Sequence, residues 1–144
     1  MEERSRLESL SGHLKMDTGY FLQDITDRYG LTDRQAHTIL HMYGILRDAY
    51  KVRTYSGQER RMPAYPKSRV DEVFPKHLEW AAGEDDIVFE LPVCCTANDA
   101  GRILHIDPRS ARKMMTDLRL RRHEAFGYVM YDVGDDGWKR MLNY

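Results

Sequence analysis

The chain has 144 residues, of which 31% are charged and 42% hydrophobic, and its formal net charge is −1. Such a chain is not a polycation, so any nucleic-acid binding has to come from local basic patches. Its two adjacent cysteines cannot form a disulfide framework, and no segment approaches the roughly 18 apolar residues of a membrane span. We therefore expect an intracellular, cytoplasmic protein that does not enter the membrane.

The N-terminal segment, residues 2–15, places Leu7, Leu10 and Leu14 three and four residues apart, which predicts an amphipathic helix. The simplest role for this helix is to pack inward as the first helix of a folded unit. The alternative is a dimerisation helix that pairs with a second copy in a homodimer.

A helix, a tight turn and a second helix are predicted over residues 20–47. Gly30 suits the turn because glycine adopts left-handed backbone angles, and Thr32 is expected to cap the second helix. The outward side chains of this second helix form a mixed polar face that can donate and accept hydrogen bonds, and they are candidate DNA contacts: Arg34, Gln35, His37, Thr38 and His41.

Residues 49–62 predict a hairpin with its turn at Ser56 and Gly57 and its return strand ending before Pro63. Its candidate DNA-binding side chains are basic: Lys51, Arg53, Arg60 and Arg61. A basic hairpin after two helices can lie along the DNA backbone or enter the minor groove. The alternative is a solvated surface hairpin.

Residues 67–91 predict two short helices, the first stopped by Pro75, and then a short strand over residues 87–91. The segment 71–90 carries seven acidic side chains and one Lys. We expect it to face solvent or a protein partner, because it would repel phosphates.

A second helix, turn and helix are predicted over residues 100–115, with the turn near His105 and a cap at Asp107. Leu104, Ile106, Ala111 and Met114 are expected to face one core. The outward side chains are basic or hydroxylic, as a major-groove reader requires, and are candidate DNA contacts: Arg109, Ser110, Arg112, Lys113 and Thr116. Strand signals follow over residues 124–133, and Trp138, Met141 and Leu142 predict a closing helix.

The two segments align without gaps at an offset of 75 residues, which pairs Gly30 with His105 and Ala36 with Ala111. Helix, turn, helix and strand is the order of a winged helix-turn-helix unit, and the chain resembles that superfamily twice. The resemblance implies a mainly α fold with small β-hairpins (α+β) in two tandem units, residues 1–66 and 67–144, joined between residues 64 and 76. It also implies binding to double-stranded DNA.

A zinc site is the main competing interpretation of the polar residues. His37 and His41 are four residues apart on one helix, and Cys94 with Cys95 would complete four ligands. No paired Cys-x-x-Cys motif supports that set, so we expect neither a metal nor a cofactor. The sequence also contains no phosphate-binding Gly-rich loop and no nucleophile elbow, so we do not expect an enzyme.

The sequence thus favours a DNA-binding transcriptional regulator with two readers and a basic wing. The alternatives are a protein-binding adaptor or inhibitor, for example of a polymerase, and a DNA-packaging or replication-initiation component.

Overall fold

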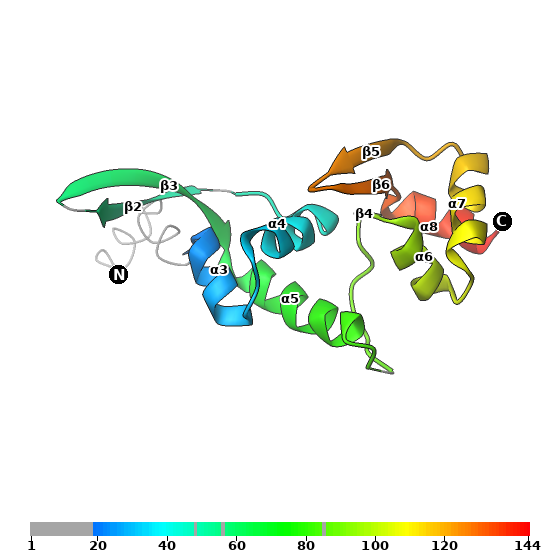
Figure 1. The fold of residues 1–144 in the computed structure, drawn as a ribbon, viewed down its shortest axis with the longest axis horizontal. Coiled ribbons are helices and arrows are strands. Elements are labelled where there is room, and N and C mark those ends of the chain that lie inside the picture. Colours follow the sequence, from blue (N-terminus) through cyan, green and yellow to red (C-terminus); the bar gives the residue numbers. More distant parts are fainter. Residues whose placement is uncertain (1–18, 48, 56, 85) are drawn as a thin grey trace, which may run out of the picture. The chain divides into compact units, whose positions relative to one another are not determined.

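A computed structural model describes residues 19–47, 49–55, 57–84 and 86–144, with the side chains of residues 49–55, 60 and 61 outside the description. The helix predicted over residues 2–15 lies outside the described residues. Within them the fold is mixed α+β, with six helices and small antiparallel sheets (Figure 1). None of these six helices is both long and apolar enough to cross a bilayer.

The chain forms two compact units. Unit 1 contains the described residues up to Ala36 and the segment Ile45–Glu90, whereas unit 2 contains His37–Gly44 and Leu91–Tyr144. The second half of the helix Asp33–Met42 therefore belongs to unit 2. The boundary between residues 66 and 67 stays a prediction from the sequence.

The first half of the described chain runs strand, helix, helix, strand, strand, helix. These elements are β1 (Gly19–Tyr20), α3 (Leu22–Tyr29), α4 (Asp33–Met42), β2 (Ala49–Tyr55), β3 (Gln58–Pro66) and α5 (Lys67–Ala81). The antiparallel sheet has the order β1-β3-β2, and the β2–β3 hairpin pairs Ala49 with Ala64 and Tyr55 with Gln58. Figure 1 shows this hairpin extending away from α3 and α5.

The second half repeats the same order of elements. They are β4 (Cys94–Cys95), α6 (Ala97–Leu104), α7 (Pro108–Asp117), β5 (Arg122–Ala125), β6 (Tyr128–Asp132) and α8 (Gly134–Leu142). Its sheet has the equivalent order β4-β6-β5. The elements β4, α6 and α7 begin and end 75 residues after β1, α3 and α4, so the two halves share local structure as well as sequence pattern.

Each helix pair turns through one residue in the left-handed region, Gly30 (φ 65°) in the first and His105 (φ 60°) in the second. At the second turn the helices approach closely, because a Cβ added to Gly101 would lie 2.7 Å from the carbonyl oxygen of Ile106. Gly101 is therefore required by the packing of α6 on the turn.

The helices that follow the turns are capped as the sequence predicts. The amide of Gln35 donates to Thr32 Oγ1 at 3.1 Å, while the Thr32 amide donates to Gln35 Oε1 at 2.9 Å. In the second half, the amide of Ser110 donates to Asp107 Oδ1 at 2.8 Å. These bonds satisfy amides that have no partner inside the helix.

The core of unit 1 is built on α5, which buries Val70, Val73, Phe74 and His77 along one face. The prediction that Pro75 stops a short helix is wrong, since α5 continues through it to Ala81. An interior proline costs about 3 kcal/mol. Burying an apolar side chain gains about 1.5–3 kcal/mol, so the three apolar residues outweigh that cost.

The β2–β3 hairpin is confirmed, but β3 runs on through Pro63 to Pro66. β1 pairs only with Tyr65 and Pro66, so β3 has a single hydrogen-bonding neighbour at Pro63. A residue without an amide hydrogen is tolerated there. The strand predicted over residues 87–91 is wrong: this segment is irregular, and the short strand is Cys94–Cys95.

Unit 2 has its own core, with Cys95, Met115 and Met130 fully buried and Trp138 Nε1 donating to the carbonyl of Pro92 at 2.8 Å. Met115, rather than the predicted Met114, is the buried methionine of α7, and Met114 is half-buried. Leu142, predicted to pack with the closing helix, is 70% exposed.

The helix α4 ends earlier than the sequence suggests, whereas α7 continues past the predicted residue 115. α4 ends at Met42, before Gly44 (φ 62°), rather than near residue 47, and α7 ends at Asp117, before Arg119 (φ 59°). A left-handed residue cannot continue a right-handed helix, so beyond Gly44 the buried Ile45 lies outside the helix and Leu46 is exposed.

Candidate nucleic-acid interface

Among the predicted DNA contacts whose side chains the structure describes, those on the outer face of α7 form the most exposed polar surface. Ala111 and Met115 are fully buried and fix the orientation of the helix. The five predicted contacts are all exposed: Arg109, Ser110, Arg112, Lys113 and Thr116. Because residues three and four apart share a helix face, burying Ala111 and Met115 sends these side chains outward together.

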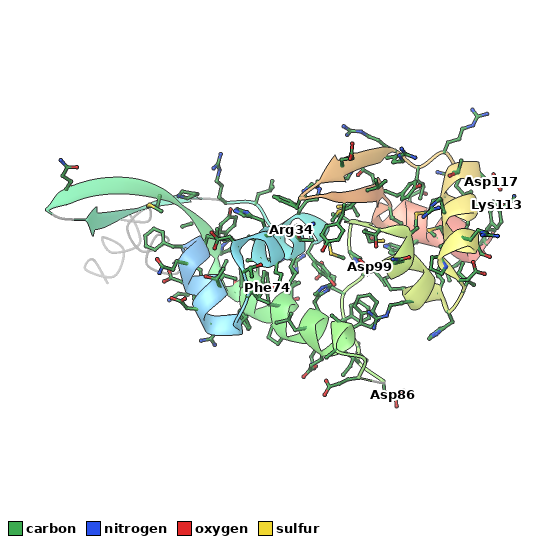
Figure 2. All side chains as sticks on the ribbon, in the orientation of Figure 1. Arg34, Phe74, Asp86, Asp99, Lys113 and Asp117 are labelled. Carbon is green, nitrogen blue, oxygen red and sulfur yellow. The ribbon has the colours of Figure 1, made fainter. Side chains whose placement is uncertain are left out.

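Two of these side chains already have partners within unit 2. Ser110 Oγ donates to Asp107 Oδ2 at 2.9 Å, so this hydroxyl supports the helix cap. Lys113 Nζ lies 2.8 Å from Asp117 Oδ2 on the same helix, a hydrogen bond that raises the pKa of Lys113 (Figure 2). Tyr144 also donates to Asp117. Lys113 is exposed, so water competes for this ion pair.

Positive charge continues from the end of α7 into β5 through Arg119, Arg121 and Arg122, all of which are exposed. Arg121 Nη1 lies 3.6 Å from Asp132 Oδ2. Exposed cationic side chains therefore continue along the chain beyond α7.

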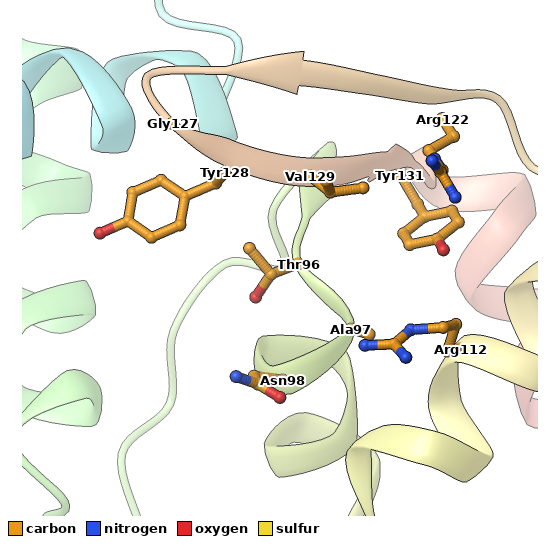
Figure 3. A pocket seen from close by; sticks show the side chains of 9 residues that line it. All are labelled: Thr96, Ala97, Asn98, Arg112, Arg122, Gly127, Tyr128, Val129 and Tyr131. Atoms are coloured by element: carbon orange, nitrogen blue, oxygen red, sulfur yellow. The ribbon is translucent and has the colours of Figure 1, made fainter.

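A pocket of about 380 Å³ lies between the start of α6, α7 and the β5–β6 hairpin. Its lining includes Arg112, Arg122, Tyr128, Tyr131 and Asn98. Figure 3 shows the Arg112 guanidinium reaching from α7 toward the start of α6, with Arg122 and Tyr131 on the hairpin side. Two guanidinium groups beside a helix N-terminus form a surface suited to a phosphate group. Sequence reasoning missed the role of Arg122, because the fold rather than any local motif brings it to α7.

The predicted reader α4 is arranged differently. Arg34 is exposed, whereas the side chain of Gln35 is used in the cap with Thr32. His37, Thr38 and His41 are half-buried. The His37 ring stacks on Phe126 with a centroid distance of 5.5 Å and an interplanar angle of 6°.

His41 faces the start of the β5–β6 hairpin, with its Nε2 2.8 Å from Nε2 of His123. Burial and the neighbouring His123 hold the pKa of His41 below its usual value. The side chains of His37 and His41 thus contact other residues of unit 2, and their role as DNA contacts stays a prediction.

The backbone forms the predicted basic hairpin, in which Arg53 pairs with Arg60 and Val52 with Arg61. The side chains predicted to contact DNA are outside the described set: Lys51, Arg53, Arg60 and Arg61. Their contribution stays a prediction.

The acidic segment 71–90 is partly neutralised within unit 1. Asp71 accepts hydrogen bonds from Tyr29 at 2.5 Å and Tyr20 at 2.8 Å, and it lies 3.2 Å from Arg28 Nε. Burial would raise the pKa of Asp71, but these hydrogen bonds and Arg28 outweigh it and hold that pKa below its usual value. Glu90 is ion-paired with Arg69. The role of the segment in binding a protein stays a prediction.

The adjacent cysteines are both free and buried. Burial and the charge of Asp132 raise the pKa of Cys94 to about 11, and burial raises that of Cys95 further. A protonated, buried thiol is a poor nucleophile, so the pair is not suited to redox exchange.

Comparison with known proteins gives no relative: no family model matches the sequence, and no curated protein or solved structure matches it.

Proposed function

We propose that the protein binds double-stranded DNA through α7 and acts as a transcriptional regulator. The observation that carries this proposal is the exposed cationic face of α7, which continues through the Arg112–Arg122 pocket into β5. Such a face supplies both phosphate neutralisation and side chains able to reach base edges.

The repeated order of elements supports the same proposal. A strand, two helices joined by a tight turn and a hairpin is the order of a winged helix-turn-helix unit, and it occurs twice in the chain. In that arrangement α7 would lie in the major groove, with the β5–β6 hairpin beside it as the wing. The pocket would hold a backbone phosphate at the edge of the groove.

The two repeats would contribute unequally to affinity. α7 carries exposed Arg109, Arg112 and Lys113, whereas on α4 only Arg34 is both cationic at neutral pH and exposed. Phosphate neutralisation supplies most non-specific affinity, so α7 should dominate binding and α4 should adjust the choice of sequence.

The test is a duplex titration of Arg109→Ala/Arg112→Ala against Arg34→Ala at two salt concentrations, with folding checked by circular dichroism. We expect the double variant to lower the salt slope by about one unit for each phosphate that is no longer neutralised. Removing an arginine that reads a base should cost about 1–3 kcal/mol of binding free energy. Arg34→Ala should change the slope less.

If the double variant stays folded and keeps both its affinity and its salt slope, α7 does not read DNA. The protein-binding adaptor that the acidic segment suggests would then replace this proposal.

A further inference from the structure

Three metal-ligating side chains from separate segments meet inside unit 2. His41 lies near the end of α4, Cys94 in β4 and His123 in β5. One ligand atom from each residue lies within 4.8 Å of the other two, and this is the group among the described residues that could hold a metal ion. The zinc set considered from the sequence shares only His41 and Cys94 with this cluster.

The environment of His123 favours metal binding. Its Nδ1 lies 2.9 Å from Asp132 Oδ1 and its Nε2 lies 2.8 Å from Nε2 of His41, so the carboxylate faces one ring nitrogen while the other faces His41. A carboxylate behind a histidine fixes the ring and its tautomer, and this is the usual arrangement around metal-bound histidines.

The other two candidate ligands have largely apolar neighbours, with Cys94 buried and His41 half-buried. Cys94 is buried, with its Sγ 3.9 Å from Met130 Sδ and 3.5 Å from the carbonyl oxygen of His41. Phe126 covers His41 edge-on, with a centroid distance of 5.8 Å. These apolar neighbours strengthen bonds to a cation, while the half-buried His41 leaves access for a water ligand.

We propose that His41, Cys94 and His123 bind a zinc ion in unit 2, with Asp132 orienting His123. Two imidazoles and one thiolate are a donor set that zinc accepts in proteins, and the fourth position would be taken by water. The metal would join α4, β4 and β5 at one point. This proposal is independent of DNA binding.

The adjustment that zinc requires is small. Zn–N bonds of about 2.0–2.1 Å in a tetrahedron place two ring nitrogens roughly 3.4 Å apart. The imidazole nitrogens of His41 and His123, now 2.8 Å apart, would separate slightly as the thiol moves closer. His41 would carry its proton on Nδ1, and Cys94 would release its proton on binding.

Cobalt(II) and zinc(II) titrations of the tag-free, reduced full chain test the proposal. We expect one equivalent of cobalt to give a thiolate charge-transfer band and the visible bands of a tetrahedral site, which zinc then bleaches. Zinc should also raise the melting temperature, because it binds only the folded protein. X-ray absorption of the zinc form should report two nitrogens and one sulfur from the protein.

Matched variants locate the site. His41→Gln should abolish the cobalt spectrum, whereas His37→Gln, one turn earlier on the same helix, should keep it. Cys94→Ser should remove the charge-transfer band, and the neighbouring Cys95→Ser should retain it. Asp132→Asn should weaken zinc binding by about 10–100-fold, as expected for a residue that orients a ligand.

The proposal is overturned if the wild-type protein shows no charge-transfer band, or if absorption finds no sulfur ligand. It is also overturned if folded His41→Gln and Cys94→Ser bind metal as the wild type does. Where circular dichroism shows that His41→Gln does not fold, His123→Gln takes its place, and the absorption measurement on the wild-type protein decides without any variant.

Discussion

The helices α4 and α7 occupy equivalent places in the two halves of the chain, yet their outer faces differ. On α7 the face above Ala111 and Met115 is open and basic. On α4 part of the corresponding face packs against β5 and the hairpin turn, since His37 stacks on Phe126 and His41 contacts His123. The same order of elements thus provides an exposed face in one half and a packed face in the other, so a repeated pattern does not imply a repeated function.

The largest effect on stability is expected where α7 packs on the core of unit 2. Met115 is fully buried, whereas the adjacent Met114 is half-buried. Met115→Ala should destabilise unit 2 by about 2–5 kcal/mol, because it leaves a cavity. Denaturant unfolding should show a clearly smaller loss of stability for Met114→Ala; a reversed order would mean that α7 is rotated from the position described.

A second comparison concerns the close approach at the turn of each helix pair. A Cβ at Gly101 would lie 2.7 Å from the Ile106 carbonyl oxygen, whereas the equivalent position 26 already carries a threonine. Gly101→Ala should destabilise the protein by about 1–3 kcal/mol through overpacking. Thr26→Ala is the matched control, expected within about 0.5 kcal/mol of the wild type in urea unfolding. A Gly101→Ala protein as stable as the Thr26→Ala protein would show that α6 does not approach the turn as closely as described.

Substitutions at the two equivalent turn residues are expected to change stability in opposite directions. Gly30 and His105 have nearly the same left-handed backbone, which costs an L-residue about 1–2 kcal/mol. Gly30→Ala should therefore lower the melting temperature and His105→Gly should raise it, each by an amount equivalent to about 1 kcal/mol. If both substitutions destabilise, the His105 side chain contributes more than its backbone strain costs.

The smallest effect is a pH dependence located in unit 1. The pKa of Asp71 is lower in the folded protein than in the unfolded chain, so its charged form is favoured by folding. Its stabilisation is complete above the unfolded pKa of about 4 and is lost as the pH falls through the folded pKa. Asp71→Asn should reduce the dependence of stability on pH below about 4. An unchanged profile would assign the acid sensitivity to other carboxyl groups.

Patterns of neighbouring residues were sufficient to predict part of this structure. The caps at Thr32 and Asp107 and the turns at Gly30 and His105 depend on neighbouring residues, so the sequence predicts them. The continuation of α5 through Pro75 depends on the core of unit 1, which a local rule about proline does not include.

The parts of the candidate site that were missed depend on distant segments that meet only in the folded chain. His41 and His123 are 82 residues apart, and Arg122 reaches the pocket only because the β5–β6 hairpin folds back beside α7. Spacing within a helix suggested His37 with His41, and no sequence pattern links either residue to β5.

Backbone amide chemical shifts, recorded as a DNA duplex is titrated into the labelled protein, test the contrast between the two helices most directly. We predict that the largest shifts fall on residues 109–117 and on Arg122, and that they diminish at high salt because phosphate interactions are screened. Shifts concentrated on residues 33–42, or no shifts at any duplex concentration, would contradict the assignment of α7 as the DNA-binding helix.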